Sequence, residues 1–476
     1  MKFLLRKASS LLRPTLLLLP MLLAAQSNPL VFAHVTVIDA TGAPAKFNQT
    51  VVINGGHIAA LEQTEKVRIP KNAHVVEATG KFLIPGLWDM HAHTASETFF
   101  PLYLANGITG VRDMGMELDK LKAWRRQIES GSMPGPRLVI AGPLVDGPHS
   151  VVPDLSVIVE SPAEGRRMVA DLKKQGVDFI KVYNFLSREA FYAIVSEARN
   201  QDLPFAGHVP LSVSAAEASD AGQKSIEHFT GILLACSSQE ARLRRMIVDG
   251  IRQSNYSPRE VNRLIFSAPP EEITKTYNEE KAKALFARFA SNGTWQVPTL
   301  FILKLITFGN DEYRNDMRLK YMPSFIRAGW APAGTNRQSK EEDEARKRLF
   351  QKELEIVGAM HRTGVKFLAG TDTPNPYVFP GFSLHDELAL LVQAGFSPME
   401  ALQAATRNPA EYLGLLDSLG TIDEGKIADF VLLQANPLED IGNTRSLAAV
   451  VLRGKLFPMS TLREMLVEVE AVNNEK

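Results

Sequence analysis

The sequence contains very little cysteine, since Cys236 is the only one among its 476 residues. A single thiol cannot form an intramolecular disulfide, and it cannot supply a metal site that needs several cysteines. The sequence also lacks an excess of charge, because Lys and Arg number 53 and Asp and Glu also number 53. Proteins that hold phosphate backbones usually carry a basic excess. We therefore expect neither an internal disulfide nor a nucleic-acid partner.

Long apolar runs are missing as well, except near the N-terminus. Four basic residues fall within the first 13 positions, and an apolar stretch at residues 16–25 follows and ends in small side chains. This order is typical of a secretory signal peptide, and the stretch is about half as long as a membrane-spanning helix needs. We expect residues 1–26 to be a signal peptide and the protein to be exported, periplasmic or secreted, without a stable transmembrane segment after cleavage. A retained N-terminal anchor is the alternative.

Two β-rich segments lie at opposite ends of the chain. Near the N-terminus, the runs LVFAHVTVIDATG, QTVVINGGHIAAL and AHVVEATG are strand-like, and Asn54-Gly55-Gly56 predicts a hairpin turn. Near the C-terminus, ADFVLLQ and LAAVVLRGKLF have the same character. We predict one small β-sandwich domain built from residues 27–83 and 414–465.

The long middle of the chain, residues 84–413, alternates between strand-like and helix-like segments, which is the pattern of a parallel α/β fold. The full length leaves room for a large domain and a smaller one, because single cores seldom exceed about 250–300 residues. Eight strand-like runs favour closure into a (β/α)8 TIM barrel. These runs are GLWDMHAHT, GITGVRDM, RLVIAGP, DFIKVYN, PFAGHVP, KSIEHFT, TWQVPTL and KFLAGTDT.

Residue types that bind metal ions fall at the ends of these runs, where an α/β barrel keeps its chemistry. His91 and His93 flank one residue of a strand, so both imidazoles face the same side and can converge on one ion. His208 and His228 end two successive runs, and Asp372 ends the eighth. A lone buried histidine is more often a core residue, and Gly-Thr-Asp can be a turn or helix cap. Four of ten histidines in one pattern favour metal ligation, with Asp372 able to accept a proton from water.

Lys181 lies inside the apolar run FIKVY. A lysine buried there with an unpaired charge would be costly. One interpretation is a salt bridge with a buried carboxylate. The interpretation we favour is reaction of the amine with CO2, which gives a carbamate (N6-carboxylysine) whose two oxygens bridge two cations.

The motifs PGLWDMHAHT, IKVY, GHV, IEH and LAGTDT, with the tail ALQAATRNPAEYLGLLDSLGTIDEGKIADFVLL, resemble those of the metal-dependent amidohydrolase superfamily. The likeness covers about residues 30–457 and points to the branch of imidazolonepropionase-like enzymes and prolidase-like dipeptidases. It implies that His91 and His93 bind the more buried of two metal ions, and that His208 and His228 bind the more exposed one.

The same resemblance implies that carboxylated Lys181 bridges both ions, and that Asp372 binds the buried ion and serves as the base. Imidazolonepropionase-type and deaminase-type members are generally mononuclear and lack the bridging lysine. Lys181 therefore favours the binuclear, peptidase-like group. The cofactors implied are two divalent metal ions, with zinc preferred, although the same ligands also suit Mn, Co or Fe.

The expected reaction is hydrolysis of an amide or peptide C–N bond by a metal-activated hydroxide, with Asp372 carrying the proton to the leaving nitrogen. Tyr183 follows Lys181 by two residues, so we expect it to share that strand face and to contact the carbonyl or tetrahedral oxygen as a second catalytic side chain. Arg112 and His149 are candidates for binding a substrate carboxylate. For these three residues a structural role fits the sequence equally well.

The resemblance implies a small-molecule or short-peptide substrate, either a dipeptide or an N-acyl amino acid. A cyclic amide or lactone hydrolase and a deaminase are the alternatives with related chemistry. A non-catalytic barrel scaffold is a further alternative, and the presence of all six ligand residues opposes it. A homo-oligomer is left open.

Overall fold

The computed structural model describes residues 28–253, 270–309, 311–330 and 339–474. The predicted signal peptide at residues 1–26 lies outside these ranges. Within them, every helix is too short or too polar to cross a lipid bilayer.

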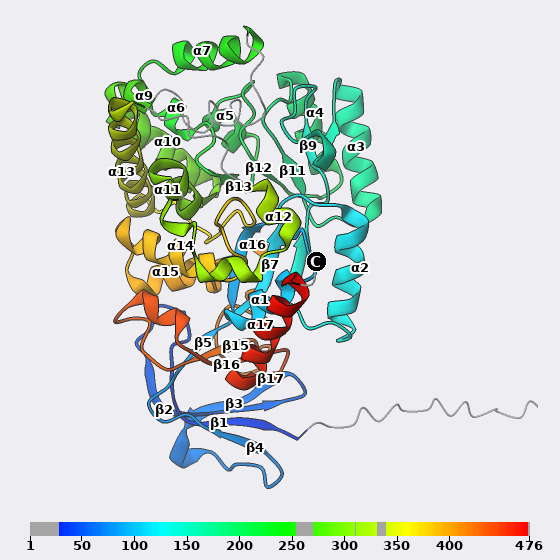
Figure 1. The fold of residues 1–476 in the computed structure, drawn as a ribbon, viewed down its shortest axis with the longest axis vertical. Helices are drawn as coiled ribbons and strands as arrows, with labels where there is room; N and C mark the ends of the chain where they lie inside the picture. The colour runs from blue at the N-terminus through cyan, green and yellow to red at the C-terminus, as the bar shows by residue number, and fades with distance from the viewer. Residues whose placement is uncertain (1–27, 254–269, 310, 331–338, 475–476) are drawn as a thin grey trace, which may run out of the picture.

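Strands from both ends of the chain form one mixed sheet of eight strands, which lies at one end of the molecule (Figure 1). Its order is β17-β16-β15-β5-β1-β2-β3, and β4 pairs with β1. The predicted hairpin is confirmed, because Asn54 pairs with His57 across Gly55 and Gly56, which both have positive φ. The strands are β1 (Leu30–Val37), β2 (Lys46–Asn54), β3 (His57–Gln63), β4 (His74–Glu77), β5 (Phe82–Pro85), β15 (Phe430–Leu433), β16 (Leu447–Leu452) and β17 (Lys455–Pro458).

Hydrogen bonds link the eight strands into a single sheet, and the two-layered sandwich that the sequence suggested stays a prediction. Both faces of that sheet are apolar in β15. Phe430 and Leu432 belong to a separate hydrophobic core that is lined by strands of the eight-stranded sheet. Val431 and Leu433 belong to the main hydrophobic core. Because successive side chains point to opposite faces of a strand, β15 contributes to both hydrophobic cores.

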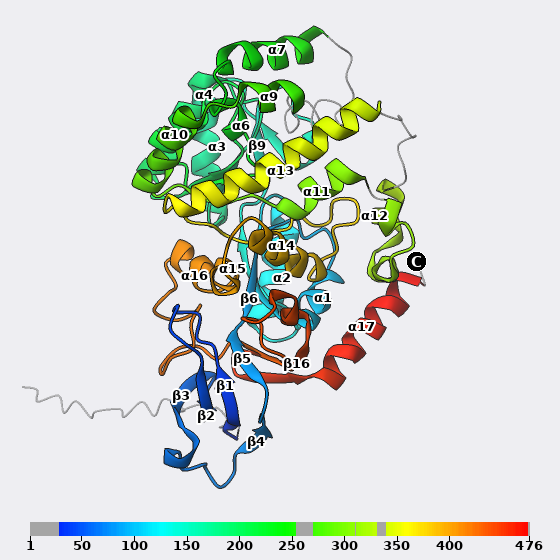
Figure 2. The same cartoon turned by 90° about the vertical axis from the view of Figure 1, so that its left-hand side faces the viewer.

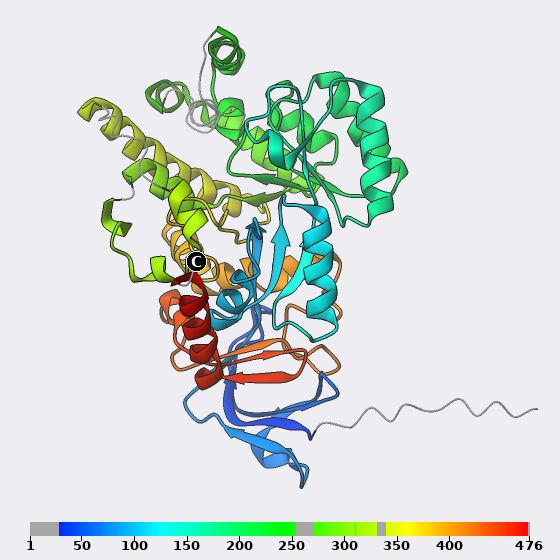
Figure 3. The same ribbon diagram turned by 45° about the vertical axis from the view of Figure 1, so that its right-hand side comes forward.

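The middle of the chain contains two parallel sheets (Figure 3). The three-stranded sheet has the order β6-β7-β8, and the six-stranded sheet has the order β10-β9-β11-β12-β13-β14. Seven of the eight predicted runs contain strands, and the short strands β9 and β10 were not predicted. Their bounds are β6 (Leu87–Ala92), β7 (Ile108–Asp113), β8 (Arg137–Ile140), β9 (Leu144–Asp146), β10 (Ser156–Ile158), β11 (Ile180–Val182), β12 (Phe205–Gly207), β13 (Ser225–Glu227) and β14 (Trp295–Val297).

The eighth predicted run, KFLAGTDT, is not an assigned strand but runs between β14 and β6. Leu368 N donates to Gln296 O at 2.9 Å, and Met90 N donates to Ala369 O at 2.9 Å. On the opposite side, Asp178 N, two residues before β11, donates to Ile140 O of β8 at 2.9 Å. The described residues therefore show an α/β fold with two parallel sheets, and one continuous eight-stranded barrel stays a prediction.

The helices alternate with these strands and cover them (Figures 1 and 2). In α3 the local reasons are visible: Ser161 accepts from Glu164 N as the N-cap, Pro162 opens the helix, and Gly176 ends it in a left-handed conformation. The helices are α1 (Phe99–Ala105), α2 (Leu118–Glu129), α3 (Pro162–Gln175), α4 (Arg188–Asn200), α5 (Ala215–Asp220), α6 (Ile232–Ala235), α7 (Glu240–Gln253), α9 (Pro270–Thr276), α10 (Glu279–Asn292), α11 (Leu300–Phe308), α12 (Ser324–Gly329), α13 (Lys340–Arg362), α14 (Phe382–Gln393), α15 (Pro398–Ala404), α16 (Arg407–Leu413) and α17 (Met459–Asn474).

Candidate metal centre

Asp372 lies at the centre of a cluster of imidazoles. Its Oδ1 is 3.3 Å from His91 Nε2 and 3.2 Å from His93 Nε2, and its Oδ2 is 3.9 Å from His228 Nε2. His208 extends the cluster, because its ring centre is 5.1 Å from that of His228. These five residues come from four places in the chain: the end of β6, the end of β12, the end of β13, and the run after residue 366.

Each of the four imidazoles has its Nδ1 held by a different neighbour. The Nδ1 atoms of the four histidines lie within hydrogen-bond distance of Glu227 Oε2 (His91, 2.7 Å), Gly115 O (His93, 2.9 Å), Asn184 Oδ1 (His208, 2.8 Å) and Thr299 Oγ1 (His228, 2.6 Å). This arrangement leaves Nε2 as the ring nitrogen with a lone pair for an ion, as in most metal-ligating histidines.

Lys181 and Tyr183 lie beside the imidazoles, on and just after β11. Lys181 is fully buried, and its Nζ is 6.0 Å from the centre of the Tyr183 ring. The Tyr183 ring is in turn 4.1 Å from the ring of His208, at an interplanar angle of 33°. Lys181 and Tyr183, which we expected on one strand face, therefore both lie next to the histidine cluster.

Burial and neighbouring charges shift the pKa values of the ligand candidates in different directions: burial alone would lower the pKa of His93, but its contact with Asp372 raises it. Burial lowers the pKa of His208 and of His228 well below the usual value, which favours neutral imidazoles. Burial alone would raise the pKa of Asp372, but the neighbouring imidazoles, His228 foremost, hold it well below its usual range. Burial also lowers the pKa of Lys181 to about 8, against the pull of Glu227 and Asp372.

Two of the residues in the cluster have backbones in the left-handed region. The φ angle is 56° at His228 and 63° at Asp372. Residues other than glycine adopt this conformation at a cost of roughly 1–2 kcal/mol. Such strain persists only where the surrounding structure enforces it, and it concentrates at functional sites.

The donor set fits a divalent cation. His91, His228 and Asp372 each offer one ligand atom, and these three atoms lie within 4.8 Å of one another. The Nε2 of His91 is buried, and its contact with Asp372 Oδ1 at 3.3 Å lacks hydrogen-bond geometry, so this nitrogen makes no hydrogen bond among the described residues, as expected of a metal-ligand atom. Neutral imidazole and carboxylate are ligands that zinc and its neighbours accept.

The structure does not support Arg112 as a contact for a substrate carboxylate. Its side chain is fully buried, and its guanidinium donates to Glu227 Oε1 at 3.0 Å, Glu227 Oε2 at 3.1 Å, and Met90 O at 2.6 Å. Because its guanidinium is buried and hydrogen-bonded to these groups, Arg112 cannot also bind a substrate carboxylate. His149 is exposed in the loop after β9, where its ring is 6.3 Å from that of Phe185, so a role at the substrate stays a prediction.

Sequence reasoning missed the residues that hold the predicted ligands. Glu227 immediately precedes His228, and its i+2 relation to Ser225 was the available indication that it faces the interior with that residue. Asn184 and Thr299 gave no such indication, because their contacts join segments that are 24 and 71 residues from the histidines they hold. Asp89 accepts from Thr371 Oγ1 at 2.6 Å and so ties β6 to the run that carries Asp372.

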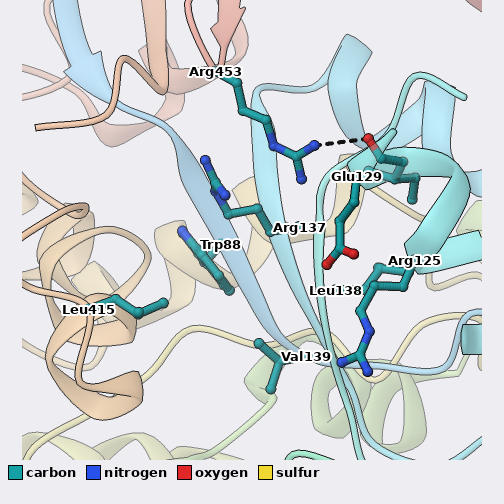
Figure 4. Close-up of a pocket in the computed structure, with 9 residues that line it drawn as sticks. Trp88, Arg125, Glu129, Arg137, Leu138, Val139, Leu415 and Arg453 are labelled. Atoms are coloured by element: carbon teal, nitrogen blue, oxygen red, sulfur yellow. Dashed lines mark hydrogen bonds between the residues drawn. The ribbon is translucent and has the colours of Figure 1, made fainter. Parts of the chain in front are cut away.

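A separate cavity of about 360 Å³ lies between β6, β8, the end of α2 and the β16–β17 turn (Figure 4). Arg125, Arg137 and Arg453 line it, but they already bind Asp178 Oδ2, Asp429 Oδ2 and Ile128 O, respectively. In Figure 4 these guanidinium groups point in different directions. The cavity lacks the converging polar groups that characterise the histidine cluster.

Comparison with known proteins places this chain in a family. The model of the Amidohydrolase family matches residues 82–457. Ochratoxinase from Aspergillus niger is 24% identical in a match that covers 92% of this chain and 91% of that protein. Imidazolonepropionase from Pseudomonas putida (strain GB-1) is 37% identical over 98 residues, 20% of this chain, so the match spans only 23% of that relative's length.

Solved structures show the same fold. Bottromycin amidohydrolase superposes with a TM-score of 0.72 and 24% identity, covering 93% of this chain and 90% of that one. A Xaa-Pro dipeptidase with bound methionine in the active site gives 0.66 and 20%, with coverage of 90% and 100%. Because the family model spans more than half of the sequence, from β5 to β17, the chain belongs to the amidohydrolase family.

Proposed function

We propose that this protein is a metal-dependent hydrolase that cleaves the C–N bond of an amide or peptide. The observation that carries the proposal is the convergence of three imidazole Nε2 atoms on the Asp372 carboxylate, with every Nδ1 in the cluster held from behind. We propose two divalent cations, preferably zinc, with His91 and His93 at one, His208 and His228 at the other, and Asp372 at the first.

Divalent cations bound here would acidify a water molecule and polarise the scissile carbonyl. The chain's own groups supply the remaining chemistry. Asp372, ionised and 3.2–3.3 Å from two imidazoles, can accept the proton of the attacking water and deliver it to the leaving nitrogen. We propose that Tyr183, whose ring packs on that of His208, orients the carbonyl oxygen through its hydroxyl.

For Lys181 we propose carboxylation of the side-chain nitrogen. A neutral amine adds to CO2, a C–N bond forms, and one proton is released, so the buried cation becomes an anion that can bridge two cations. The pKa of about 8 supports this step, because a substantial fraction of the amine is neutral near pH 7.5. The alternative is an unmodified ammonium attracted by Glu227 and Asp372.

The substrate class we propose is a dipeptide or an N-acyl amino acid. Support comes from the dipeptidase among the structural neighbours and from the binuclear ligand set that Lys181 would complete. We also infer that the two parallel sheets close into a (β/α)8 barrel through residues 366–373, because backbone hydrogen bonds join this run to both β14 and β6. Export through the N-terminal segment remains part of the proposal.

Metal content and hydrolysis measured on one preparation test the proposal. We expect the zinc-loaded full chain to hold two ions and to hydrolyse members of a library of dipeptides and N-acyl amino acids. A chelator should abolish turnover and lower the melting temperature, because an ion present at 1,000 times its Kd stabilises a protein by about 4 kcal/mol. A metal-loaded protein that is inactive toward the whole library would contradict the proposed substrate class, and a protein that takes up no metal would contradict the site.

Two variants separate catalysis from folding. Asp372→Asn keeps the shape of the side chain but not its basicity, and turnover should fall by about 100-fold or more. Glu387→Gln is the matched control. Glu387 is a buried carboxyl on α14, and burial raises its pKa to about 8, so glutamine resembles its neutral form.

A separate measurement tests the carboxylation of Lys181. With ¹³C-labelled bicarbonate, a carbamate resonance in ¹³C NMR should appear in the wild type and be absent from Lys181→Met.

A further inference from the structure

The buried carboxylate of Glu227 is bonded on both sides. On one side its Oε2 is 2.7 Å from His91 Nδ1, and on the other side both of its oxygens accept from the guanidinium of Arg112, at 3.0 and 3.1 Å. Ser225 Oγ donates to Oε1 at 2.6 Å. Neither Glu227 nor Arg112 is exposed to solvent. The carboxylate therefore has no freedom to leave His91.

Arg112 is fixed by groups on several elements. Its Nε donates to Met90 O of β6 at 2.6 Å, and its Nη1 donates to Tyr412 OH at 2.9 Å. The guanidinium carbon lies 5.6 Å from the centre of the Phe179 ring and 5.1 Å from that of Tyr412. A fork held at this many points presents its two Nη2 bonds to the carboxylate in one orientation.

Among the four imidazoles of the cluster, His91 is the one whose Nδ1 contact is a carboxylate. The others contact a backbone carbonyl, an amide oxygen and a hydroxyl. A carboxylate behind an imidazole fixes the tautomer and raises the basicity of the opposite nitrogen more than a neutral acceptor does. The same His91 has the buried Nε2 that lacks a hydrogen-bond partner among the described residues.

We propose that Glu227, held by Arg112, is a positioning residue that fixes His91 as the Nδ1–H tautomer and so presents Nε2 to the metal ion. The inference rests on the proposed metal-dependent function. It gives Arg112 the role of holding the Glu227 carboxylate in place. It predicts that weakening the Glu227–His91 contact lowers metal affinity even where the metal-free fold is intact.

The test compares Glu227→Gln with Glu387→Gln, which replaces another fully buried carboxyl outside the cluster. Zinc dissociation constants are measured on the metal-free full chain by competition with a chromogenic chelator, and urea unfolding of the same metal-free samples reports stability. We expect Glu227→Gln to weaken binding of the tightest ion about 10–100-fold, the range for partners behind metal-ligating histidines. Glu387→Gln should bind zinc within about twofold of the wild type.

Ser225→Ala gives a milder variant if Glu227→Gln does not fold. It removes the hydrogen bonds that Ser225 Oγ makes with Glu227 Oε1, Arg112 Nη1 and Tyr412 OH but leaves the Glu227–Arg112 charge pair, and we expect zinc affinity to fall about fivefold. In ¹⁵N NMR of histidine-labelled, metal-free protein, the Nδ1–H signature of His91 should be present in the wild type and reduced in the variant that folds.

The outcomes separate the two proposals. If the wild type binds zinc and neither Glu227→Gln nor Ser225→Ala weakens binding more than Glu387→Gln does, Glu227 has a structural role only and the inference is wrong. If the wild type itself binds no zinc, the proposed function fails first. Weaker binding with unchanged metal-free stability supports the positioning role.

Discussion

Two glycines allow backbone segments to approach the ligand residues closely. A Cβ at Gly370 would lie 2.7 Å from His91 Cβ, and a Cβ at Gly207 would lie 2.3 Å from Val182 O and 2.8 Å from Lys181 Cδ. Gly207 also has a φ of 130°, which side chains other than glycine rarely adopt. The stem of Lys181 can therefore lie across β12 only because that position has no side chain.

We predict that Gly207→Ala lowers the free energy of unfolding by about 3 kcal/mol or more and also weakens metal binding, because the methyl group collides with backbone and with Lys181. Gly176→Ala is the control: its φ is 84°, yet no atom lies within 4 Å of the added Cβ. That variant should lose only the conformational cost of about 1 kcal/mol. Equal losses in urea unfolding of the two variants would show that crowding at Gly207 is unimportant.

At the scale of single elements, helix α13 carries a carboxyl group that its surroundings keep neutral. Glu353 is buried, and burial raises its pKa from 4.5 to about 8. The folded protein thus holds this proton more tightly than the unfolded chain does. Between pH 4.5 and 8 the unfolded state releases the proton and the folded state does not, so stability falls as the pH rises through this window.

Glu353→Gln removes this dependence. We predict that the stability of the variant relative to the wild type increases by a few kcal/mol from pH 5 to pH 9, since one pKa unit corresponds to about 1.4 kcal/mol. Urea unfolding across this range measures the difference. Glu355→Gln, on the exposed side of the same helix, should keep a nearly constant difference from the wild type. If the stability difference between Glu353→Gln and the wild type did not change with pH, the Glu353 carboxyl would be charged in the folded state.

On the scale of the whole molecule, the two ends of the chain complete the main core as well as their own sheet. The residues of β15, β16 and β17 that join the main core are Val431, Leu433, Leu447, Val450, Leu452 and Phe457. Burial of six such side chains contributes on the order of 10 kcal/mol, which is comparable with the net stability of a typical protein. The sheet at the end of the molecule is thus part of what holds the site's scaffold together.

We therefore predict that a chain ending at residue 413 shows no cooperative unfolding transition in circular dichroism and remains aggregated. A chain that begins at residue 28 retains every described element and serves as the control, with an unfolding midpoint close to that of the full chain. Cooperative unfolding of the chain that ends at residue 413, with metal uptake intact, would show that the C-terminal strands are dispensable.

Much of this architecture could be predicted from periodicity. Runs such as PFAGHVP and KSIEHFT became β12 and β13, and the turn at Gly55 and Gly56 formed as expected. The sequence did not show that Phe430 and Val431 serve different cores, nor that KFLAGTDT would pair without becoming a regular strand. Those outcomes depend on which segment comes to lie alongside, and local pattern does not contain that information.

The sequence by itself determined the chemistry available to this protein: imidazoles, a lysine and an aspartate at the ends of strand-like runs, because side-chain type and strand period are local properties. Only the tertiary structure decided how they are used. Arg112, which in sequence suggested a substrate contact, is buried behind Glu227, and Glu227, which in sequence only accompanied His228, holds His91. These partners are 115 and 136 residues apart, and a contact over such a separation exists only once the sheets have brought their strands together.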